Sequence, residues 1–245
     1  MNLDIQVKDN SLAIVDWHDG GAGQIHSWIE KAQGYEVACF INPTDEALNI
    51  DPAKIKRDAK QFSYPTANSF KDKPLINSSD WVKVIKDLGI KNVLVTTDDP
   101  FERFEQINMA RKEGLKLINA IHPSALIMEE AILHDNIILH ARSFIGYRAE
   151  LFPGSIVTSG HLDHHNVLRD CASVDPGAVC AGNVTVGAFS RLHTGAVVKN
   201  RIRIGENSIV GAGAVVIEDV PDNVTVVGVP ARIIKQRPPH KIAGR

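Results

Sequence analysis

A six-residue period governs the second half of the sequence. Large apolar residues recur every six positions from Ile121 to Leu151, and after one five-residue step the spacing resumes at Ile156 and runs to Val216. Hydrophobic residues make up 44% of the chain, so the ten successive matches from Leu162 to Val216 would arise by chance roughly three times in ten thousand. The period is therefore a structural repeat.

This period limits what the second half can fold into. An amphipathic helix repeats about every 3.6 residues and a half-buried strand about every two, so neither fits. A solenoid of short strands joined by turns does fit, because each hexad then sends one large side chain into the interior. A run of ordinary hairpins would not keep its phase over so many repeats. Seventeen hexads, at three to a coil, predict nearly six coils.

The first half, to about residue 118, has a different pattern. Short apolar runs alternate with amphipathic stretches, which is typical of an α/β domain. We expect strands at 11–17, 35–41, 92–97 and 115–121, and helices at 24–33, 78–88 and 100–114. Ser78 or Ser79 is expected to cap the second helix. The proline-rich stretch 43–77 is expected to be irregular.

Composition narrows the class of protein. Lys and Arg number 27 and Asp and Glu 29, so the net charge of −2 gives no basic field for nucleic acid. No apolar run approaches the ~18 residues that span a bilayer, and the polar start lacks a signal-peptide core, so we predict a cytoplasmic protein with no membrane partner. Cys39, Cys171 and Cys180 form no CxxC pair, so we expect reduced packing residues.

Two phrases near the end of the repeat carry a family resemblance. IRIGENSIVGAGAVV occupies 202–216 and VPDNVTVVGVPARII occupies 220–234. This half resembles the hexapeptide-repeat, left-handed β-helix acyltransferases. The α/β half leads into it through IHPSALI at 121–127. The whole chain thus resembles the bacterial sugar acyltransferases that acetylate sialic acids and nucleotide-linked amino sugars such as bacillosamine.

The resemblance implies an architecture and a function. It implies a Rossmann-like α/β domain with a parallel sheet at 1–118 that binds the sugar nucleotide, a left-handed parallel β-helix at 119–234, and a basic tail at 235–245. The activity it implies is acetyl-CoA-dependent acyl transfer, N-acetylation favoured, to an amino sugar in surface polysaccharide or glycan biosynthesis. It also implies a homotrimer with acetyl-CoA between subunits and no metal.

The stretch SGHLDHH at 159–165 is the candidate catalytic segment. The register turns Leu162 inward, which places His164 and His165 at a turn, and gives Asn166 the smaller interior position. The histidines admit three interpretations: solvated side chains, a metal site, or a catalytic base with helpers. Their close spacing is poor for zinc, because successive turn residues point in different directions.

Alignment with the family favours the catalytic base. LDHHNVLRDCASVDPGA at 162–178 is similar, without a gap, to the family phrase EHDCVIGDFVHIAPGA, which places the catalytic histidine on His164. A histidine titrating near neutrality can accept the proton of the attacking amine or hydroxyl. The acidic residue that follows it in the family is His165 here, and Asp163 is the alternative helper. Ser173 replaces a second histidine, and Val157 replaces an upstream asparagine.

The resemblance also places the coenzyme contacts. Gly182 lies eighteen residues after His164, one coil further, where a backbone N–H can polarise the thioester carbonyl; the alternative is a glycine required only by the turn. The tail from Arg232 onwards could reach the coenzyme phosphates through Lys235, Arg237, Lys241 and Arg245, or be simply solvated. The predicted coenzyme contacts are Ser173, Gly182, Thr194, Ala212 and Arg232.

The sugar-nucleotide contacts are expected in the first half. The strand SLAIV leads into DWHDGGAGQIHSW, whose glycines could present N–H groups to a phosphate. The loop is about two residues longer than the family's GAGGHG loop, and an acidic pair after the second strand has become Asn42 and Pro43. A plain strand-to-helix turn is the alternative. The predicted contacts are Gly20, Gly21, Ala22, Gly23 and Asn42.

Two other functions stay open at this point. A catalytically silent β-helix scaffold would keep the fold and lose the site, and the altered residues around His164 fit that alternative. A metal-dependent carbonic anhydrase-like enzyme is the other alternative.

Overall fold

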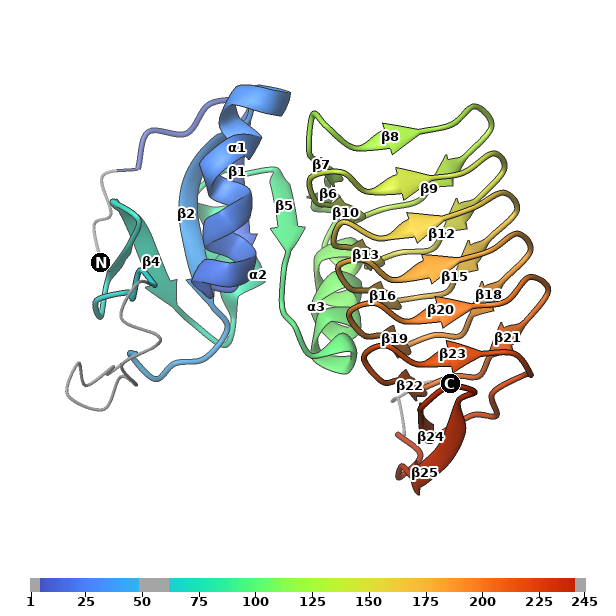
Figure 1. Ribbon diagram of the computed structural model, residues 1–245. Helices are drawn as coiled ribbons and strands as arrows, with labels where there is room; N and C mark the ends of the chain where they lie inside the picture. The colour runs from blue at the N-terminus through green and yellow to red at the C-terminus, as the bar shows by residue number, and fades with distance from the viewer. Residues whose placement is uncertain (1–4, 49–61, 241–245) are drawn as a thin grey trace. The chain divides into compact units, whose positions relative to one another are not determined.

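The computed structural model describes residues 5–48 and 62–240, and the chain forms two compact units, Met1–Ile118 and Asn119–Arg245 (Figure 1). The predicted fold class, an α/β domain followed by a left-handed parallel β-helix, is confirmed. Among the described residues, no helix is both long enough and apolar enough to cross a bilayer.

The first unit is a mainly parallel sheet with helices packed on it. Its strand order is β3-β4-β2-β1-β5-β6, and only β3 runs antiparallel, to β4. The strands are β1 (Ser11–Val15), β2 (Glu36–Asn42), β3 (Ser69–Phe70), β4 (Lys73–Asn77), β5 (Asn92–Val95) and β6 (Lys116–Leu117). The helices are α1 (Gln24–Gln33), α2 (Trp81–Asp87) and α3 (Pro100–Lys112), and a π-helical turn, η1 (Asp19–Gly23), precedes α1.

The apolar runs explain this sheet. All five residues of β1 are buried, as in the central strand of a parallel sheet covered on both faces. The chain passes from β1 to β2 on one side and later to β5 on the other, so the strand order reverses at β1. In open α/β sheets, ligands bind beyond the carboxyl ends of the strands at such a switch point.

Two expectations for this unit were wrong. The stretch 43–77 contains β3 and β4, because Leu75 and Ile76 pair with Phe40 and Ile41 of β2 and are buried there. The residue before α2 is Asp80, not a serine, and no side chain caps this helix. The part of that stretch at 49–61 lies outside the described residues.

The second unit is a stack of seventeen two-residue strands that form three faces. The first face holds β7 (Ala120–Ile121), β10 (Ile138–Leu139), β13 (Ile156–Val157), β16 (Ser173–Val174), β19 (Arg191–Leu192) and β22 (Ile209–Val210). The second face holds β8 (Leu126–Ile127), β11 (Phe144–Ile145), β14 (His161–Leu162), β17 (Val179–Cys180), β20 (Val197–Val198) and β23 (Val215–Val216). The third face holds β9 (Ile132–Leu133), β12 (Glu150–Leu151), β15 (Val167–Leu168), β18 (Thr185–Val186) and β21 (Arg203–Ile204).

The interior of the β-helix is a column of apolar side chains, one from each strand. From Leu139 to Val210 the inward residue of every strand has no exposed surface. The predicted register was wrong at one position. Val157, not Ile156, points inward, because Val157 pairs with Leu139 and Ile156 with Ile138. The five-residue step therefore lies between Val157 and Leu162, at a corner one residue shorter than the others.

The end of the β-helix includes residues expected in the tail. Strand β24 (Val224–Val227) extends the first face, and β25 (Arg232–Gln236) pairs antiparallel to it, so Lys235 belongs to a strand. Arg237 Nε donates to the carbonyl of Asn207 at 2.9 Å, which fixes the chain against the last coils. Lys241 and Arg245 lie outside the described residues.

Candidate functional site

His164 lies at the corner between the second and third faces of the β-helix, in the turn from β14 to β15. Leu162 and Asn166 are buried on either side of it, while His164 and His165 are exposed, as predicted. His165 adopts the left-handed conformation, with φ of 58°, which lets the chain turn the corner. The corner thus holds both rings outside the apolar interior.

The ring of His164 contacts His165, not Asp163. The two Nδ1 atoms are 3.0 Å apart, and the rings meet edge to face at a centroid distance of 5.2 Å. One ring must donate Nδ1–H and the other must accept it. Asp163 Oδ1 instead accepts the backbone N–H of His164 at 2.8 Å. When His164 donates, its Nε2 carries the lone pair that a general base needs.

Gly182 stacks against His164 from the next coil, and this predicted stacking is confirmed. The backbone N–H of Asn183 donates to the carbonyl of His164 at 2.9 Å, which sets the register of the two corners. A Cβ at Gly182 would overlap the His164 ring. Glycine is thus required for the ring to lie where it does, independently of any role for the Gly182 amide.

Tyr147 is a neighbour that the sequence analysis missed. It lies in the preceding coil, where its carbonyl accepts the N–H of His165 at 2.8 Å, and the rings of Tyr147 and His165 meet edge to face at a centroid distance of 5.6 Å. The Tyr147 hydroxyl donates to Glu130 at 3.0 Å. The Arg148 guanidinium, 2.7 Å from Glu130, lowers the pKa of that carboxyl. Tyr147 precedes His164 by one coil, which here has seventeen residues because it contains the short corner before Leu162, and this spacing was the available signal.

The third histidine of the stretch points elsewhere. His161 lies on the second face and stacks on Phe144, with ring centroids 4.4 Å apart. In the described ranges, no three His, Cys, Asp or Glu side chains are grouped as a metal ion would require.

The predicted coenzyme residues lie at separate places on the β-helix. Thr194 and Ala212 occupy equivalent exposed positions in consecutive coils, at the corner between the first and second faces. Gly182 lies at the other edge of the second face, Ser173 is buried on the first face, and Arg232 is on β25. One chain therefore does not bring these five residues together.

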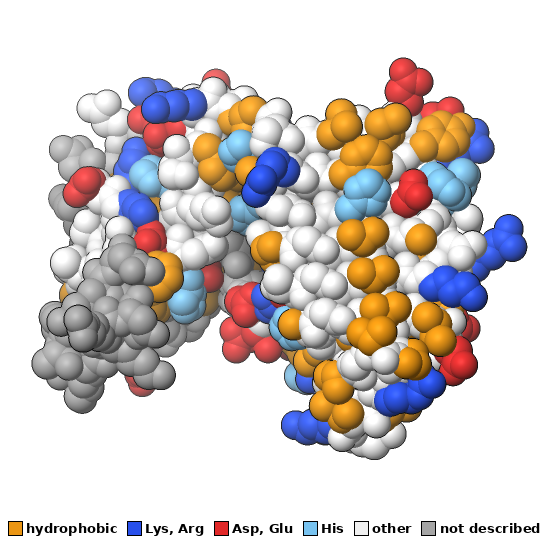
Figure 2. Space-filling view, viewed as in Figure 1, with side chains coloured by type: hydrophobic (Ala, Val, Ile, Leu, Met, Phe, Trp, Pro, Cys, Tyr) orange, Lys and Arg blue, Asp and Glu red, His pale blue; other side chains and the backbone are white. Residues whose placement is uncertain are grey.

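The second face, which separates these corners, is apolar apart from His161. Figure 2 shows hydrophobic side chains in a column down the β-helix. Leu126 is 55% exposed at its top and Val197 40% exposed further along, with Phe144 and Val179 between them. Exposed apolar surface of this extent is typical of an interaction surface.

A second polar cluster was also missed. Asp175 lies at the corner between the first and second faces, and its Oδ2 is 2.9 Å from Nδ1 of His193 and 3.0 Å from Nε of Arg191. Asp175 lies in one coil, and Arg191 and His193 lie in the next. Thr194 follows His193 directly, so this cluster borders the predicted coenzyme positions.

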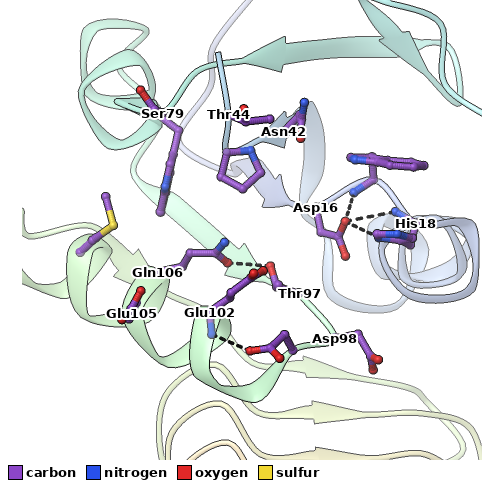
Figure 3. Close-up of a pocket in the computed structure, with 15 residues that line it drawn as sticks. Asp16, His18, Asn42, Thr44, Ser79, Thr97, Asp98, Glu102, Glu105 and Gln106 are labelled. Atoms are coloured by element: carbon purple, nitrogen blue, oxygen red, sulfur yellow. Dashed lines mark hydrogen bonds and ion pairs between the residues drawn. The ribbon is translucent and has the colours of Figure 1, made fainter. Parts of the chain in front are cut away.

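The first unit contains a cavity of about 620 Å³ at the carboxyl ends of β1, β2 and β5. The segments after these strands line it together with α3 and the start of α2 (Figure 3). Asn42 is part of this lining, and its amide donates to Asn77 Oδ1 at 2.9 Å. The cavity thus lies at the switch point of the sheet.

The glycine turn next to the cavity is closed on itself. The N–H groups of Gly21 and Gly23 both donate to the carbonyl of His18 at 3.1 Å. Ala22 is buried, and Gly20 is exposed beside it. A Cβ at Gly23 would come within 2.9 Å of Lys71 Cε, so the close packing there requires glycine. These contacts favour the alternative interpretation, a strand-to-helix turn.

Asp16, Trp17 and His18 line the cavity and were missed by the sequence analysis. Asp16 is buried with φ of 104°, an unusual backbone conformation for a residue other than glycine. Its Oδ1 accepts the N–H of Trp17 at 2.6 Å and lies 2.6 Å from Nδ1 of His18. This hydrogen bond raises the pKa of His18, although burial opposes the shift. The two extra residues of the loop were the only signal.

Solved structures of sugar N-acetyltransferases are similar to this chain over nearly its whole length. A variant of GDP-perosamine N-acetyltransferase from Caulobacter crescentus, in complex with CoA and GDP-perosamine, is 25% identical, with a TM-score of 0.79 over 96% of this chain and 100% of that one. The acetyltransferase domain of PglB from Neisseria gonorrhoeae FA1090, in complex with acetyl coenzyme A, is 26% identical, with a TM-score of 0.76 over 93% and 100%. The predicted resemblance is confirmed.

Curated acetyltransferases match part of the chain. Galactoside O-acetyltransferase of Escherichia coli K12 is 30% identical over 82 residues, 34% of this chain and 37% of that protein. Serine acetyltransferase of Bacillus subtilis 168 is 56% identical over 123 residues, 47% of this chain and 48% of that protein. The chain spans less than half the length of these relatives. No protein-family model matches it.

Proposed function

We propose that this chain is an acetyl-CoA-dependent N-acetyltransferase whose acceptor is a nucleotide-linked amino sugar. The observation that carries the proposal is the contact of the His164 ring with Gly182 in consecutive coils, within a fold whose similar structures hold CoA or acetyl coenzyme A. This contact brings a titratable base and a glycine backbone N–H to the same corner, where the His164 ring is exposed and covers the buried Gly182.

The proposed reaction is a direct transfer. The acceptor amine attacks the thioester carbonyl while Nε2 of His164 takes the amine proton, and the Gly182 N–H donates to the developing oxyanion. When the carbonyl re-forms, the C–S bond breaks and the thiolate of CoA receives a proton from the His164 imidazolium. The products are the N-acetylated sugar and free CoA.

A covalent acetyl-enzyme is disfavoured by the cysteines. Cys39, Cys171 and Cys180 are all buried. Burial raises the pKa of the Cys39 and Cys180 thiols to about 12, so neither supplies a thiolate near neutrality. Transfer within a ternary complex needs no such nucleophile.

His165 is the proposed helper of His164, because it contacts the ring whereas Asp163 is engaged by a backbone N–H. An imidazole stabilises a neighbouring imidazolium less than a carboxylate does. Because His165 replaces a carboxylate beside His164, the site also fits a second candidate function, a β-helix module without catalytic activity.

We further propose that the active form is a homotrimer, with residues 1–118 binding the sugar nucleotide and residues 119–234 carrying the transfer. The apolar second face is a surface that a neighbouring subunit would cover, and Thr194 and Ala212 of one subunit could then complete the site at Gly182 of another. Sedimentation as a monomer of 26.8 kDa at micromolar concentration would contradict the trimer. Location in the cytoplasm stays a prediction.

Thiol release from acetyl-CoA tests the proposed function. The intact protein is incubated with a panel of 3-amino and 4-amino sugar nucleotides, and the product is identified by mass. Release that depends on one amino sugar, together with addition of a single acetyl group to its nitrogen, is the expected result. Acetyl-CoA binding without transfer to any member of the panel would favour the silent module.

A further inference from the structure

The short corner at 158–160 lacks a residue that other coils have at the edge between the first and second faces. From the second coil onwards, each corner on this edge has one left-handed residue, in order Arg142, Ser159, Gly177, Gly195 and Gly213. In the last three of these coils the residue before it is Pro176, Thr194 or Ala212, and each is exposed. At the short corner Thr158 directly follows the inward residue Val157, and Ser159 is already left-handed. The exposed position is therefore missing from this one coil.

Ser159 takes over the hydrogen bonds that tie this corner to its neighbours. Its Oγ donates to the carbonyl of Ala141 in the coil before at 2.7 Å, and its N–H donates to Oγ of the buried Ser143 at 3.2 Å. Its carbonyl accepts the N–H of Gly177 in the coil after at 3.1 Å. The corner is thus fixed from both sides.

Side-chain exposure also shows that this corner is withdrawn. Thr158 and Ser159 are half-buried and Gly160 is buried, whereas the corners of the coils before and after carry the exposed residues Arg142 and Pro176. A Cβ at Gly160 would come within 2.7 Å of the Val174 side chain, so only glycine lets the chain cut the corner. The space left between Arg142 and Pro176 is called the corner recess below.

The corner recess lies at the level of His164. Residues 158–160 and His164 flank the same strand, β14, at opposite edges of the second face. In the proposed trimer the second faces pack along their length, which requires a three-fold axis parallel to the β-helix. Rotation about this axis keeps each coil at its height and sets one edge of the face against the opposite edge of the next. The corner recess of one subunit then faces His164 of its neighbour.

The reacting carbonyl carbon leaves one direction for the acyl chain. Of the four groups on this carbon in the tetrahedral intermediate, the nitrogen lies towards His164 and the oxygen towards Gly182. The sulfur leads along the coenzyme towards Thr194 and Ala212 of the neighbouring subunit. Because His164 and Gly182 belong to the same subunit, the acyl chain is left to point across the groove, at the neighbour's corner recess. A residue in the missing position would fill this space.

We propose that the corner recess holds the acyl chain of the donor, and that the protein transfers acyl groups of three or four carbons at least as well as acetyl. The proposal rests on the proposed function and names its donor class. One residue accounts for about 3.5 Å of extended chain, which is comparable with the two methylene groups by which butyryl exceeds acetyl. The bonds made and broken do not change: nitrogen bonds to the acyl carbon, the C–S bond breaks, and the amine proton passes through His164 to the thiolate.

Steady-state kinetics with acetyl-, propionyl-, butyryl- and octanoyl-CoA tests the proposal. We expect kcat/KM to hold or to rise by up to about fourfold for each added methylene as far as butyryl, since each is removed from water. Octanoyl-CoA should be poor, because its chain is longer than the recess. A fall of about tenfold or more from acetyl to propionyl would overturn the proposal.

An insertion that restores the missing residue is the sharpest variant. One alanine added between Thr158 and Ser159 should lower the ratio of butyryl to acetyl kcat/KM by about tenfold, because the recess is filled. Thr158→Phe adds bulk at the same corner without changing the chain length, and should lower the ratio in the same direction if the insertion does not fold. One alanine added between the exposed Pro123 and Ser124, two coils earlier on the same edge, is the matched control and should leave the ratio unchanged. Equal loss with both donors in a folded insertion variant would overturn the recess.

Calorimetric titration without an acceptor distinguishes this proposal from the proposed function. We expect butyryl-CoA to bind the parent more tightly than acetyl-CoA. That result without transfer to any amino sugar would contradict the transferase and leave the corner recess intact. Efficient transfer of acetyl alone would overturn the recess and leave the transferase intact. Circular dichroism and sedimentation show whether each variant is folded and assembled.

Discussion

The β-helix and the α/β unit bring side chains together in different ways. In the β-helix, residues one coil apart are neighbours, so Arg148, His165 and Asn183 take the same left-handed corner conformation in three successive coils, the first of which is one residue shorter. In the α/β unit, the cavity is made of segments that follow β1, β2 and β5 and lie far apart in the chain. The residues that meet in a solenoid can be found by counting along the chain from one coil to the next. The residues that meet at a sheet edge depend instead on how several loops fold.

The same contrast holds for stability. Each coil of the β-helix packs only on its two neighbours, so its core is a continuous column whose every member is equivalent. The α/β core instead depends on a few large residues such as Trp81 and Phe40. Changes in the column should therefore be severe wherever they are made, while changes in exposed corners should act locally.

The largest expected loss of stability comes from placing a charged side chain in the apolar interior of the β-helix. Val210 has no exposed surface, so Val210→Asp should cost roughly several kcal/mol in the free energy of unfolding, because the carboxylate gains neither water nor a partner. Thermal unfolding measures the loss. Val167→Asp, on the outward side of β15, is the matched control and should cost much less. If Val210→Asp melted like the parent, the interior register would be wrong.

The next effect is on the proposed base. His164→Ala should lower kcat by roughly 10² to 10⁴-fold and leave the KM for acetyl-CoA nearly unchanged, since a general base acts in the transition state. His165→Ala should have a smaller effect in the same direction, and Asp163→Ala and His161→Ala smaller ones still. Steady-state kinetics with the true acceptor measures all four. Full activity in His164→Ala would eliminate this mechanism and leave proximity as the source of rate.

A smaller effect is expected from filling the space beside that base. Gly182→Ala would push its Cβ into the His164 ring, so the ring must turn away and kcat should fall by about tenfold or more. Stability should change little, because the His164 side chain is exposed and can move. In a His164→Ala background the same substitution should cost no further activity. An equal loss in both backgrounds would mean that Gly182 acts without the ring.

The smallest expected effects are changes of stability with pH, which have opposite signs for one histidine in each unit. Burial, reinforced by His122, lowers the pKa of His140 in the β-helix to about 4, so the unfolded chain binds this proton more readily. Stability should therefore fall as pH falls from about 6.5 towards 4, by about 2 kcal/mol between pH 7.5 and 5. His18 in the α/β unit has a raised pKa, so its contribution is present at low pH and is lost as pH rises through that value.

Variants at these two histidines test the opposite signs. His140→Gln should remove most of the acid destabilisation of the parent between pH 7.5 and 5, measured by chemical unfolding. His18→Gln should make the chain slightly less stable at pH 6 than at pH 8, relative to the parent. An unchanged pH profile in His140→Gln would mean that this imidazole is not the buried titrating group.

The sequence predicted the β-helix and its site better than it predicted the cavity of the α/β unit. The repeat identified the β-helix, and counting one coil from His164 found Gly182, because parallel pairing fixes eighteen residues as one turn of the solenoid. The shifted step at Val157 was missed, because Ile156 and Val157 are both apolar and only strand pairing distinguishes them. Asp16 and His18 were missed because the longer loop after β1 shows only that the backbone there differs, and does not indicate that Asp16 takes an unusual conformation and holds His18.

The short corner at 158–160 indicates where this protein can tolerate change in length. Between Val157 and Leu162 the chain has one residue fewer than at other corners, yet β14 still pairs with β11 and β17 in the ordinary register. The pairing register of a strand therefore does not depend on the length of the corner before it. Loops of other lengths could be inserted at exposed corners without displacing later coils, which makes the β-helix a scaffold for grafted segments away from His164.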